Sequence, residues 1–233
     1  MRTAAVLPVK RFAAAKSRLG ASVPDALRVA LARAMVSDVL AALAQTPALE
    51  LTILVTGQAD LARAAHEHGA AVIEDGADRG QSAAVALGVA RALAEGFERV
   101  LCVPGDCPAL DPDELQQLLH GDAAAQVTIM PDRHGSGTNA LLLAPADAIE
   151  PSFGPDSCER HRDLALAGDL SCRVERVPSL LLDIDTGADL QELRERLSGL
   201  RARAARTRAV LEGDLAALDG DLAARSDTPT AAR

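Results

Sequence analysis

Aspartates end two apolar, strand-like segments: Asp106 in VLCVPGDCPAL, and Asp183 and Asp185 in SLLLDIDTGADL. Residues i and i+2 of a strand point to the same face, and Mg²⁺ prefers one or two carboxylates together with substrate phosphates. The pattern therefore predicts that all three aspartates approach one Mg²⁺. Two simpler roles stay open: Asp106 could order the turn before Pro108, and Asp185 could cap the helix that follows.

A cationic loop follows the first apolar run of the chain. The stretch LPVKRFAAAKSRLG carries Lys10, Arg11, Lys16 and Arg18 within nine residues. Cations grouped beyond a strand end suit a triphosphate, because its charge must be neutralised during displacement. The loop contains neither GxxxxGK[ST] nor GxGxxG, so it is neither a P-loop nor a dinucleotide fingerprint. Taken alone, the four cations are equally compatible with a solvated surface.

Two further loops, DRHGSGTN and PSFGPDSCERH, combine glycines with hydroxyl groups. Glycine lets backbone N–H groups approach an anion closely, and hydroxyls can donate to it. The residues suited to this role are Gly135, Gly137, Thr138, Gly154, Ser157, Arg160 and the loop histidines His134 and His161. The loops predict a second ligand bearing a phosphate or carboxylate, although each loop alone could be an ordinary turn.

Apolar runs alternate with segments of helical spacing as far as about residue 120. The expected strands are 4–9, 51–56, 71–74, 99–104, 127–130, 139–143, 172–177 and 180–184, and the expected helices are 24–44, 61–68, 81–94, 111–119 and 188–197. Such alternation predicts an α/β protein with a parallel sheet and helices on both faces. Ligands of these sheets bind beyond the carboxyl ends of the strands, where the polar loops lie. The alternation breaks after residue 130, which predicts a mixed sheet with an inserted substrate-binding portion.

Composition excludes several classes of protein. Apolar residues make up 48% of the 233, which is too many for a disordered chain. Aromatic residues make up 1%, with no Trp or Tyr, so single-stranded nucleic acid has no stacking platform. The net charge of −9 opposes broad binding to a phosphate backbone. We therefore expect no nucleic-acid partner, and any nucleotide should bind at a small local site with a divalent cation.

The same reading predicts a cytoplasmic protein without a membrane partner. No run approaches about 18 apolar residues, the length of a membrane-spanning helix, and the opening apolar run is broken by Pro8. The four cysteines, Cys102, Cys107, Cys158 and Cys172, form no CxxC pair, which favours reduced thiols.

The chain divides into a main domain, 1–199, and a tail, 200–233. The tail begins with Arg201, Arg203, Arg206 and Arg208 and continues with Leu211, Leu215 and Leu218 at helical spacing, and its last residues are expected to be disordered. The arginines are typical of a solvated helix face. A contact in a homodimer, or one with an anionic partner, is the alternative.

Together these segments resemble the guanylyltransferases of coenzyme F-420 biosynthesis over about residues 3–197. GTNALLL and FGPDSCERH carry the specific part of the resemblance; the other segments are shared with the wider nucleotidyltransferase superfamily. The resemblance implies a Rossmann-like mixed sheet of the nucleotide-diphospho-sugar transferase type. It also implies transfer of GMP from GTP to a small phosphorylated carboxylic acid, with release of pyrophosphate. Phosphoenolpyruvate is favoured because the Ala- and Arg-rich composition is typical of bacteria; 2-phospho-L-lactate and 3-phospho-D-glycerate stay open.

The resemblance also implies roles for single residues. It places the acceptor on Thr138, Gly154 and Ser157, the metal on Asp106 and Asp185 with Asp183 beside them, the GTP phosphates on Lys10, Lys16 and Arg18, and the nucleoside near Gly80 and Ser82. Asp106, Lys16 and Arg18 would serve catalysis, the two cations by stabilising the leaving pyrophosphate. Ser82 stands where the family usually has Asn, which puts that nucleoside contact in question.

Two other functions stay open. One is nucleotidyl transfer to an unrelated acceptor, such as a molybdopterin or a sugar phosphate, which the GTN and FGPxS loops argue against. The other is a non-catalytic, nucleotide-sensing domain, which the retained carboxylates and cationic loop disfavour.

Overall fold

The computed structural model describes residues 1–12, 23–121, 125–199 and 203–213. Within them the strands form a seven-stranded sheet in the order β3-β2-β1-β4-β6-β5-β7. The strands are β1 (Thr3–Val9), β2 (Leu51–Thr56), β3 (Ala71–Glu74), β4 (Arg99–Cys102), β5 (Val127–Pro131), β6 (Thr138–Leu143) and β7 (Cys172–Val174). β6 runs antiparallel to both of its neighbours, and every other pairing is parallel. The expectation of a mixed α/β sheet is confirmed.

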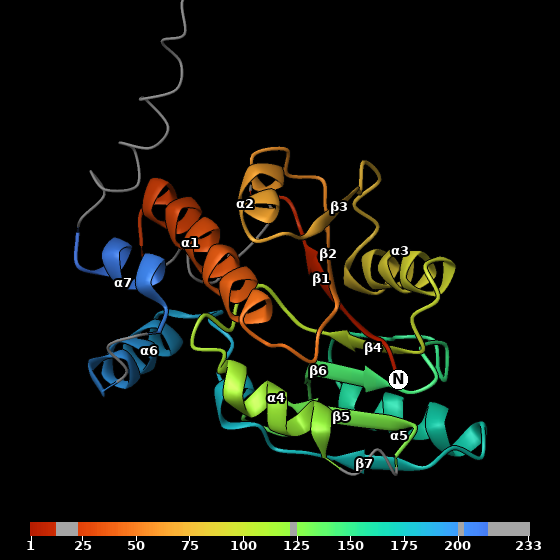
Figure 1. The fold of residues 1–233 in the computed structure, drawn as a ribbon. Coiled ribbons are helices and arrows are strands. Elements are labelled where there is room, and N and C mark those ends of the chain that lie inside the picture. The colour runs from red at the N-terminus through yellow and green to blue at the C-terminus, as the bar shows by residue number, and fades with distance from the viewer. Residues whose placement is uncertain (13–22, 122–124, 200–202, 214–233) are drawn as a thin grey trace, which may run out of the picture.

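Helices cover both faces of the sheet (Figure 1). They are α1 (Asp25–Ala44), α2 (Leu61–Glu67), α3 (Gln81–Ala94), α4 (Pro112–His120), α5 (Ser157–Ala167), α6 (Gly187–Gly199) and α7 (Ala205–Leu211). Ala5 and Leu7 of β1 pack with α1, α2 and α4, whereas Ala4 and Val6 pack with α3 and α5. Alternate residues of one strand are thus buried on opposite faces, which explains why the central strands are continuously apolar.

The segment expected as a strand at 180–184 is not one. A short 3-10 helix covers Pro178–Leu180, and the chain then runs without regular structure to α6. The alternating apolar residues are buried as predicted: Leu182 and Ile184 pack against α1 and α6. Their backbone pairs with loops instead of a ladder, since the Ile184 N–H donates to the carbonyl oxygen of Asp106 at 3.1 Å. The alternation of apolar residues predicted correctly which side chains are buried. It did not predict the hydrogen-bond partners of the backbone.

Helix α7 lies within the segment expected as a tail, and it packs on α1 (Figure 1). Thr207 and Val210 of α7 are buried. Asp38 of α1 accepts the backbone N–H groups of Arg206 and Thr207 at 3.1 and 2.8 Å. Burial raises the pKa of Asp38, while these hydrogen bonds and the charge of Arg206 oppose that shift. Residues 200–202 and 214–233 lie outside the described part of the chain.

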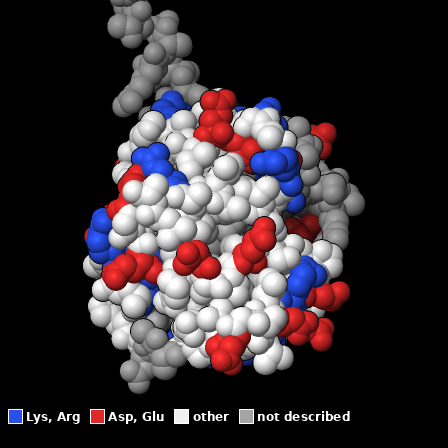
Figure 2. All heavy atoms as spheres, turned by 90° about the vertical axis from the view of Figure 1, so that its right-hand side faces the viewer, with Lys and Arg blue, Asp and Glu red and all other residues white. Residues whose placement is uncertain are grey.

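Two arginines of the segment expected as a tail form ion pairs with the main domain. Arg203 pairs with Asp111, and Arg206 lies 3.8 Å from Glu67. On the face shown in Figure 2, Lys and Arg of the described residues form no continuous track.

No described helix is long and apolar enough to cross a membrane. All four cysteines are free thiols, and of these only Cys172 is exposed.

Candidate active site

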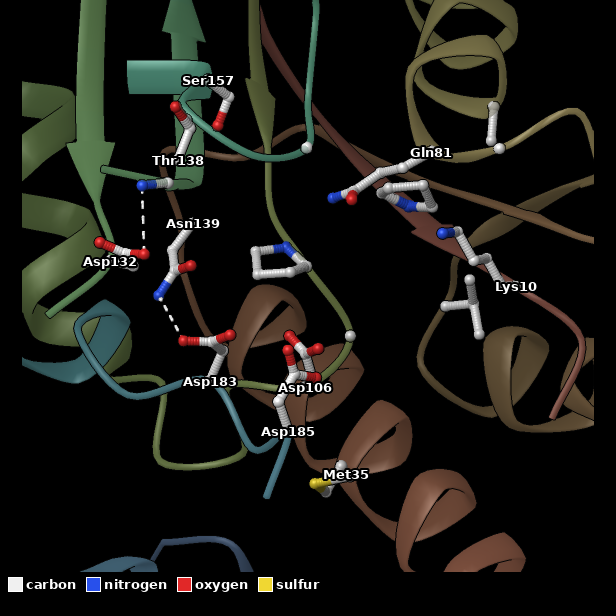
Figure 3. Close-up of a pocket in the computed structure, with 18 of the residues that line it drawn as sticks. Lys10, Met35, Gln81, Asp106, Asp132, Thr138, Asn139, Ser157, Asp183 and Asp185 are labelled. Carbon is white, nitrogen blue, oxygen red and sulfur yellow. Dashed lines mark hydrogen bonds between the residues drawn. The ribbon is translucent and has the colours of Figure 1, made fainter. Parts of the chain in front are cut away.

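A cavity of about 660 Å³ opens at one edge of the sheet. Strands β1, β4 and β5 end at this edge, and β6 begins there because it runs antiparallel to β4 and β5. The loops after the parallel strands and the first residues of β6 therefore line one space. The reversal of β6 is what brings Thr138 and Asn139 opposite Asp106 (Figure 3).

The structure brings the three predicted carboxylates to the same wall of the cavity. Asp106, Asp183 and Asp185 all line it, and Figure 3 shows their side chains converging. The backbone bond from Ile184 to Asp106 joins the two segments. Burial raises the pKa of Asp183, and the nearby charges of Asp106 and Asp185 raise it further. Such mutual repulsion is what a bound cation would relieve.

The carboxylates leave room for a substrate. Within the described ranges, no three His, Cys, Asp or Glu side chains stand close enough to enclose a metal ion by themselves. Mg²⁺ that is bound through a nucleotide takes one or two carboxylates and completes its shell with phosphates and water. A pair of aspartates that faces an open cavity fits this mode of Mg²⁺ binding, in which the substrate and water supply the remaining ligands.

A buried network orients the Asp185 segment. Oδ2 of Asp189 accepts the backbone N–H groups of Asp185 and Thr186 at 3.0 and 2.7 Å and the Thr186 hydroxyl at 2.9 Å. Although burial opposes it, these bonds and the charge of Arg133 lower the pKa of Asp189. The Asp189 N–H points back to the Thr186 hydroxyl at 3.3 Å, a capping box. Thr186 therefore caps α6, and Asp185 lines the cavity.

Asp189 also connects this segment to the opposite loop. Arg133, in the loop between β5 and β6, forms an ion pair with Asp189 and a second one with Glu192 at 2.7 Å. Neither Asp132 nor Arg133 was identified as functional from the sequence. The spacing of Thr186 and Asp189 was a usable signal, because S/T-x-x-D/E before an apolar run indicates a capping box.

Asp132 lines the cavity and fixes the loop before β6. Its two carboxylate oxygens accept the N–H groups of Ser136 and Gly137, each at 3.1 Å. A Cβ at Gly137 would lie 2.7 Å from Asp132 Oδ2, so a side chain there would displace the carboxylate that holds the loop. An aspartate followed by a Gly-Ser-Gly stretch is a typical turn signal, and it could have identified Asp132.

All three residues expected at the acceptor line the cavity: Thr138, Gly154 and Ser157. Gly154 has φ +119°, a conformation that residues with a side chain rarely adopt. Ser157 begins α5 and is almost fully buried, yet its Oγ has no hydrogen-bond partner among the described residues. A buried hydroxyl without a partner is costly, and here it faces a space that a ligand could fill.

The two loop histidines do not line the cavity. His134 is exposed and accepts a hydrogen bond from Arg133. His161 is fully buried behind Thr138, with Nδ1 3.0 Å from Thr138 Oγ1. Burial lowers the pKa of His161 to about 4, and the charge of Arg160 adds to the shift. His161 therefore supports a cavity residue instead of meeting a ligand itself.

The residues expected at the nucleotide fall into three groups. Lys10 and Gly80 line the cavity, together with Gln81 (Figure 3). The Ser82 hydroxyl instead accepts the Phe153 N–H at 2.9 Å, so it links the first turn of α3 to the loop before α5, residues 151–156, which we call the acceptor loop. Lys16 and Arg18 lie outside the described residues.

Comparison with solved structures identifies the fold. A Desulfovibrio desulfuricans protein, solved under the description of a nucleotide-diphospho-sugar transferase, matches with a TM-score of 0.70. The match has 21% sequence identity and covers 93% of this chain and 96% of that one. At this identity the likeness shows the fold, which is the Rossmann-like mixed sheet of the nucleotide-diphospho-sugar transferase type.

Sequence comparison then gives the family. The model of the family "Guanylyl transferase CofC like" matches residues 3–205, and the chain belongs to that family. A phosphoenolpyruvate guanylyltransferase of Conexibacter woesei is 46% identical over 203 residues, covering 86% of this chain and 91% of the relative. Another, from Sphaerobacter thermophilus, is 39% identical over 194 residues, with 83% and 93% covered.

Proposed function

We propose that this chain transfers GMP from GTP to phosphoenolpyruvate and releases pyrophosphate, in the biosynthesis of coenzyme F-420. The observation that carries the proposal is one cavity with two unlike walls. Carboxylates suited to a nucleotide-bound cation lie on one wall, and Thr138, Gly154 and Ser157, suited to an oxyanion, lie on another. The 46% identity to a phosphoenolpyruvate guanylyltransferase supports the same reaction.

The reaction requires the protein to position the two substrates and to stabilise the negative charge of the phosphates. A phosphate oxygen of the acceptor forms a bond to the α-phosphorus of GTP, and the bond from that phosphorus to the β-phosphate oxygen breaks. The attacking oxygen is already anionic, so no residue needs to remove a proton. Thr138 and Ser157 would orient the acceptor, while Lys10 and, from the sequence alone, Lys16 and Arg18 would stabilise the departing pyrophosphate.

Mg²⁺ is the cofactor we propose, with Asp106 and Asp185 as its protein ligands. When bound, it would neutralise charge on the α-phosphate and the leaving group. Asp183, which accepts a hydrogen bond from Asn139 at 3.4 Å, would stand beside this pair. Asn139 in turn donates to the Leu180 carbonyl at 2.6 Å and so fixes the approach of the 180–185 segment to β6.

A panel of substrates tests the proposal. GTP, ATP and CTP are each combined with phosphoenolpyruvate, 2-phospho-L-lactate and 3-phospho-D-glycerate, and pyrophosphate release is measured with Mg²⁺ and with EDTA. We expect release with GTP and phosphoenolpyruvate, and none with EDTA. Preference for another acid would correct the acceptor only. No release with any pair would contradict nucleotidyl transfer.

A homodimer and a cytoplasmic location stay predictions.

A further inference from the structure

The two ring nitrogens of His161 have different partners, and these partners fix its tautomer. Nε2 lies 2.9 Å from the backbone nitrogen of Ser152. A backbone N–H can only donate, so Nε2 must carry the lone pair. In a neutral imidazole the proton is then on Nδ1. Nδ1 lies 3.0 Å from Thr138 Oγ1 and therefore donates to it.

The surroundings of His161 keep the ring neutral and in place. It is fully buried, and Phe153 packs against it edge to face, with ring centroids 5.3 Å apart. The guanidinium of the preceding residue, Arg160, donates to the carbonyl oxygens of Ser152 and Pro155. The ring is thus clamped between the acceptor loop and the first residue of β6.

This donation decides what the Thr138 hydroxyl can do. Its oxygen accepts from His161, so its own proton must go elsewhere. Among the described residues the hydroxyl has no second partner, and Thr138 lines the cavity. Figure 3 shows the hydroxyls of Thr138 and Ser157 at the same end of the cavity. A phosphate or carboxylate oxygen accepts hydrogen bonds and cannot donate, so it fits a hydroxyl that is held as a donor.

We propose that His161 is a positioning residue that turns the Thr138 hydroxyl into a fixed hydrogen-bond donor for an oxyanion of the acceptor. The inference rests on the proposed function, because it assumes that the acceptor's phosphate or carboxylate occupies the Thr138 and Ser157 end of the cavity. His161 does not touch the acceptor, and it acts only through Thr138.

Two substitutions separate the two bonds of His161. The amide nitrogen of an asparagine reaches the place of Nδ1, so His161→Asn keeps the donor to Thr138. The amide oxygen of a glutamine reaches the place of Nε2, so His161→Gln keeps the acceptor for Ser152 and leaves Thr138 without its donor. We expect His161→Gln to raise KM for the acceptor about tenfold and His161→Asn about twofold, because a lost buried hydrogen bond is worth about one kcal/mol, or fivefold to tenfold. KM for GTP should change in neither.

A double-mutant cycle with Thr138→Val tests whether the effect passes through Thr138. Thr138→Val should raise KM for the acceptor about tenfold, and adding His161→Gln should raise it no further. The inference would be overturned if the two substitutions multiplied their effects on KM for the acceptor in the double variant. It would also be overturned if His161→Asn and His161→Gln raised this KM equally. Thermal melting of each variant shows whether it is folded at the assay temperature.

The tautomer can be measured without turnover. Nitrogen-15 NMR of the full wild-type chain labelled at histidine should show the His161 proton on Nδ1. A proton on Nε2 would overturn the inference even if the enzyme is active. Conversely, absence of turnover with all three acids, together with the Nδ1 tautomer, would contradict the proposed function and leave the predicted donor geometry supported.

Discussion

The two sides of the cavity are built differently. On the nucleotide side, Lys10 and Gly80 come from loops after parallel strands, and the hydrogen bond from the Asp78 N–H to Asp75 is a local turn contact. On the acceptor side, Asp132 bonds to the loop before β6. His161 bonds to the hydroxyl of Thr138, the first residue of β6. The acceptor side is therefore positioned by side-chain hydrogen bonds, one of them from the fully buried His161, before any ligand arrives. Single substitutions behind the acceptor loops should therefore change acceptor binding without changing GTP binding.

The largest expected effect is at the boundary between the two sides. Asp106→Asn keeps the shape of the side chain but removes the charge that we assign to Mg²⁺ binding. GMP transfer should fall by about a thousandfold or more, since metal stabilisation of the displacement is worth several kcal/mol. Steady-state assays over a range of Mg²⁺ measure the loss, and circular dichroism checks the fold. Turnover near that of the wild type would remove Asp106 from the metal site.

The network behind Asp185 should have the next largest effect. Asp189→Asn weakens the ion pair with Arg133 and the bonds to the Asp185 segment. Loss of a residue that orients a metal ligand typically costs tenfold to a hundredfold in affinity or activity. We expect a rise of about tenfold in the Mg²⁺ concentration that gives half-maximal rate.

Glu195→Gln is the matched control for Asp189→Asn. Glu195 is an exposed residue of the same helix, and it accepts a hydrogen bond from Gln191. Its substitution should leave the Mg²⁺ dependence unchanged. If both variants shift that dependence equally, the effect is one of general charge and the positioning role of Asp189 is wrong.

The hydroxyl of Ser157 should matter for the acceptor alone. Ser157→Ala should raise KM for phosphoenolpyruvate about fivefold, because one hydrogen bond to a charged group is lost. Ser179→Ala is the control: its hydroxyl is also buried and without a partner among the described residues, but Ser179 does not line the cavity. Initial-rate kinetics should show no change for that variant. An equal rise in KM for GTP in Ser157→Ala would mean that the two sides are not separate.

The smallest effect concerns stability. Burial and the nearby carboxylates raise the pKa of Asp183 in the folded protein. An acid with a raised folded pKa destabilises the fold above its unfolded pKa of about 3.9, and this cost vanishes at lower pH. Asp183→Asn should therefore raise Tm at pH 7 by about 1–3 °C, less at pH 4.5. Exposed Asp163→Asn on α5 should leave Tm unchanged. A lower Tm for Asp183→Asn at pH 7 would mean that its charge is stabilising.

Most of the fold could be predicted from the sequence. Strands β2 and β3 and helix α3 have the predicted bounds, because apolar period and polar interruptions coincide there. The segment 180–184 was predicted wrongly because burial, not strand pairing, sets its alternation. Asp106 and Thr138 could be found because they follow or begin strands, and Asp185 because it follows a buried apolar segment, although that segment is not a strand. Asp132 and the His161–Thr138 contact could not, since they depend on how two loops pack.

The most direct test of GMP transfer to phosphoenolpyruvate is to observe the product. Phosphorus-31 NMR follows a reaction of the full chain with GTP, phosphoenolpyruvate and Mg²⁺. We predict two coupled doublets from a new phosphate–phosphate bridge between GMP and the acceptor, together with pyrophosphate in equal amount. Loss of GTP to GDP and inorganic phosphate, with the phosphoenolpyruvate signal unchanged, would contradict the proposed transfer.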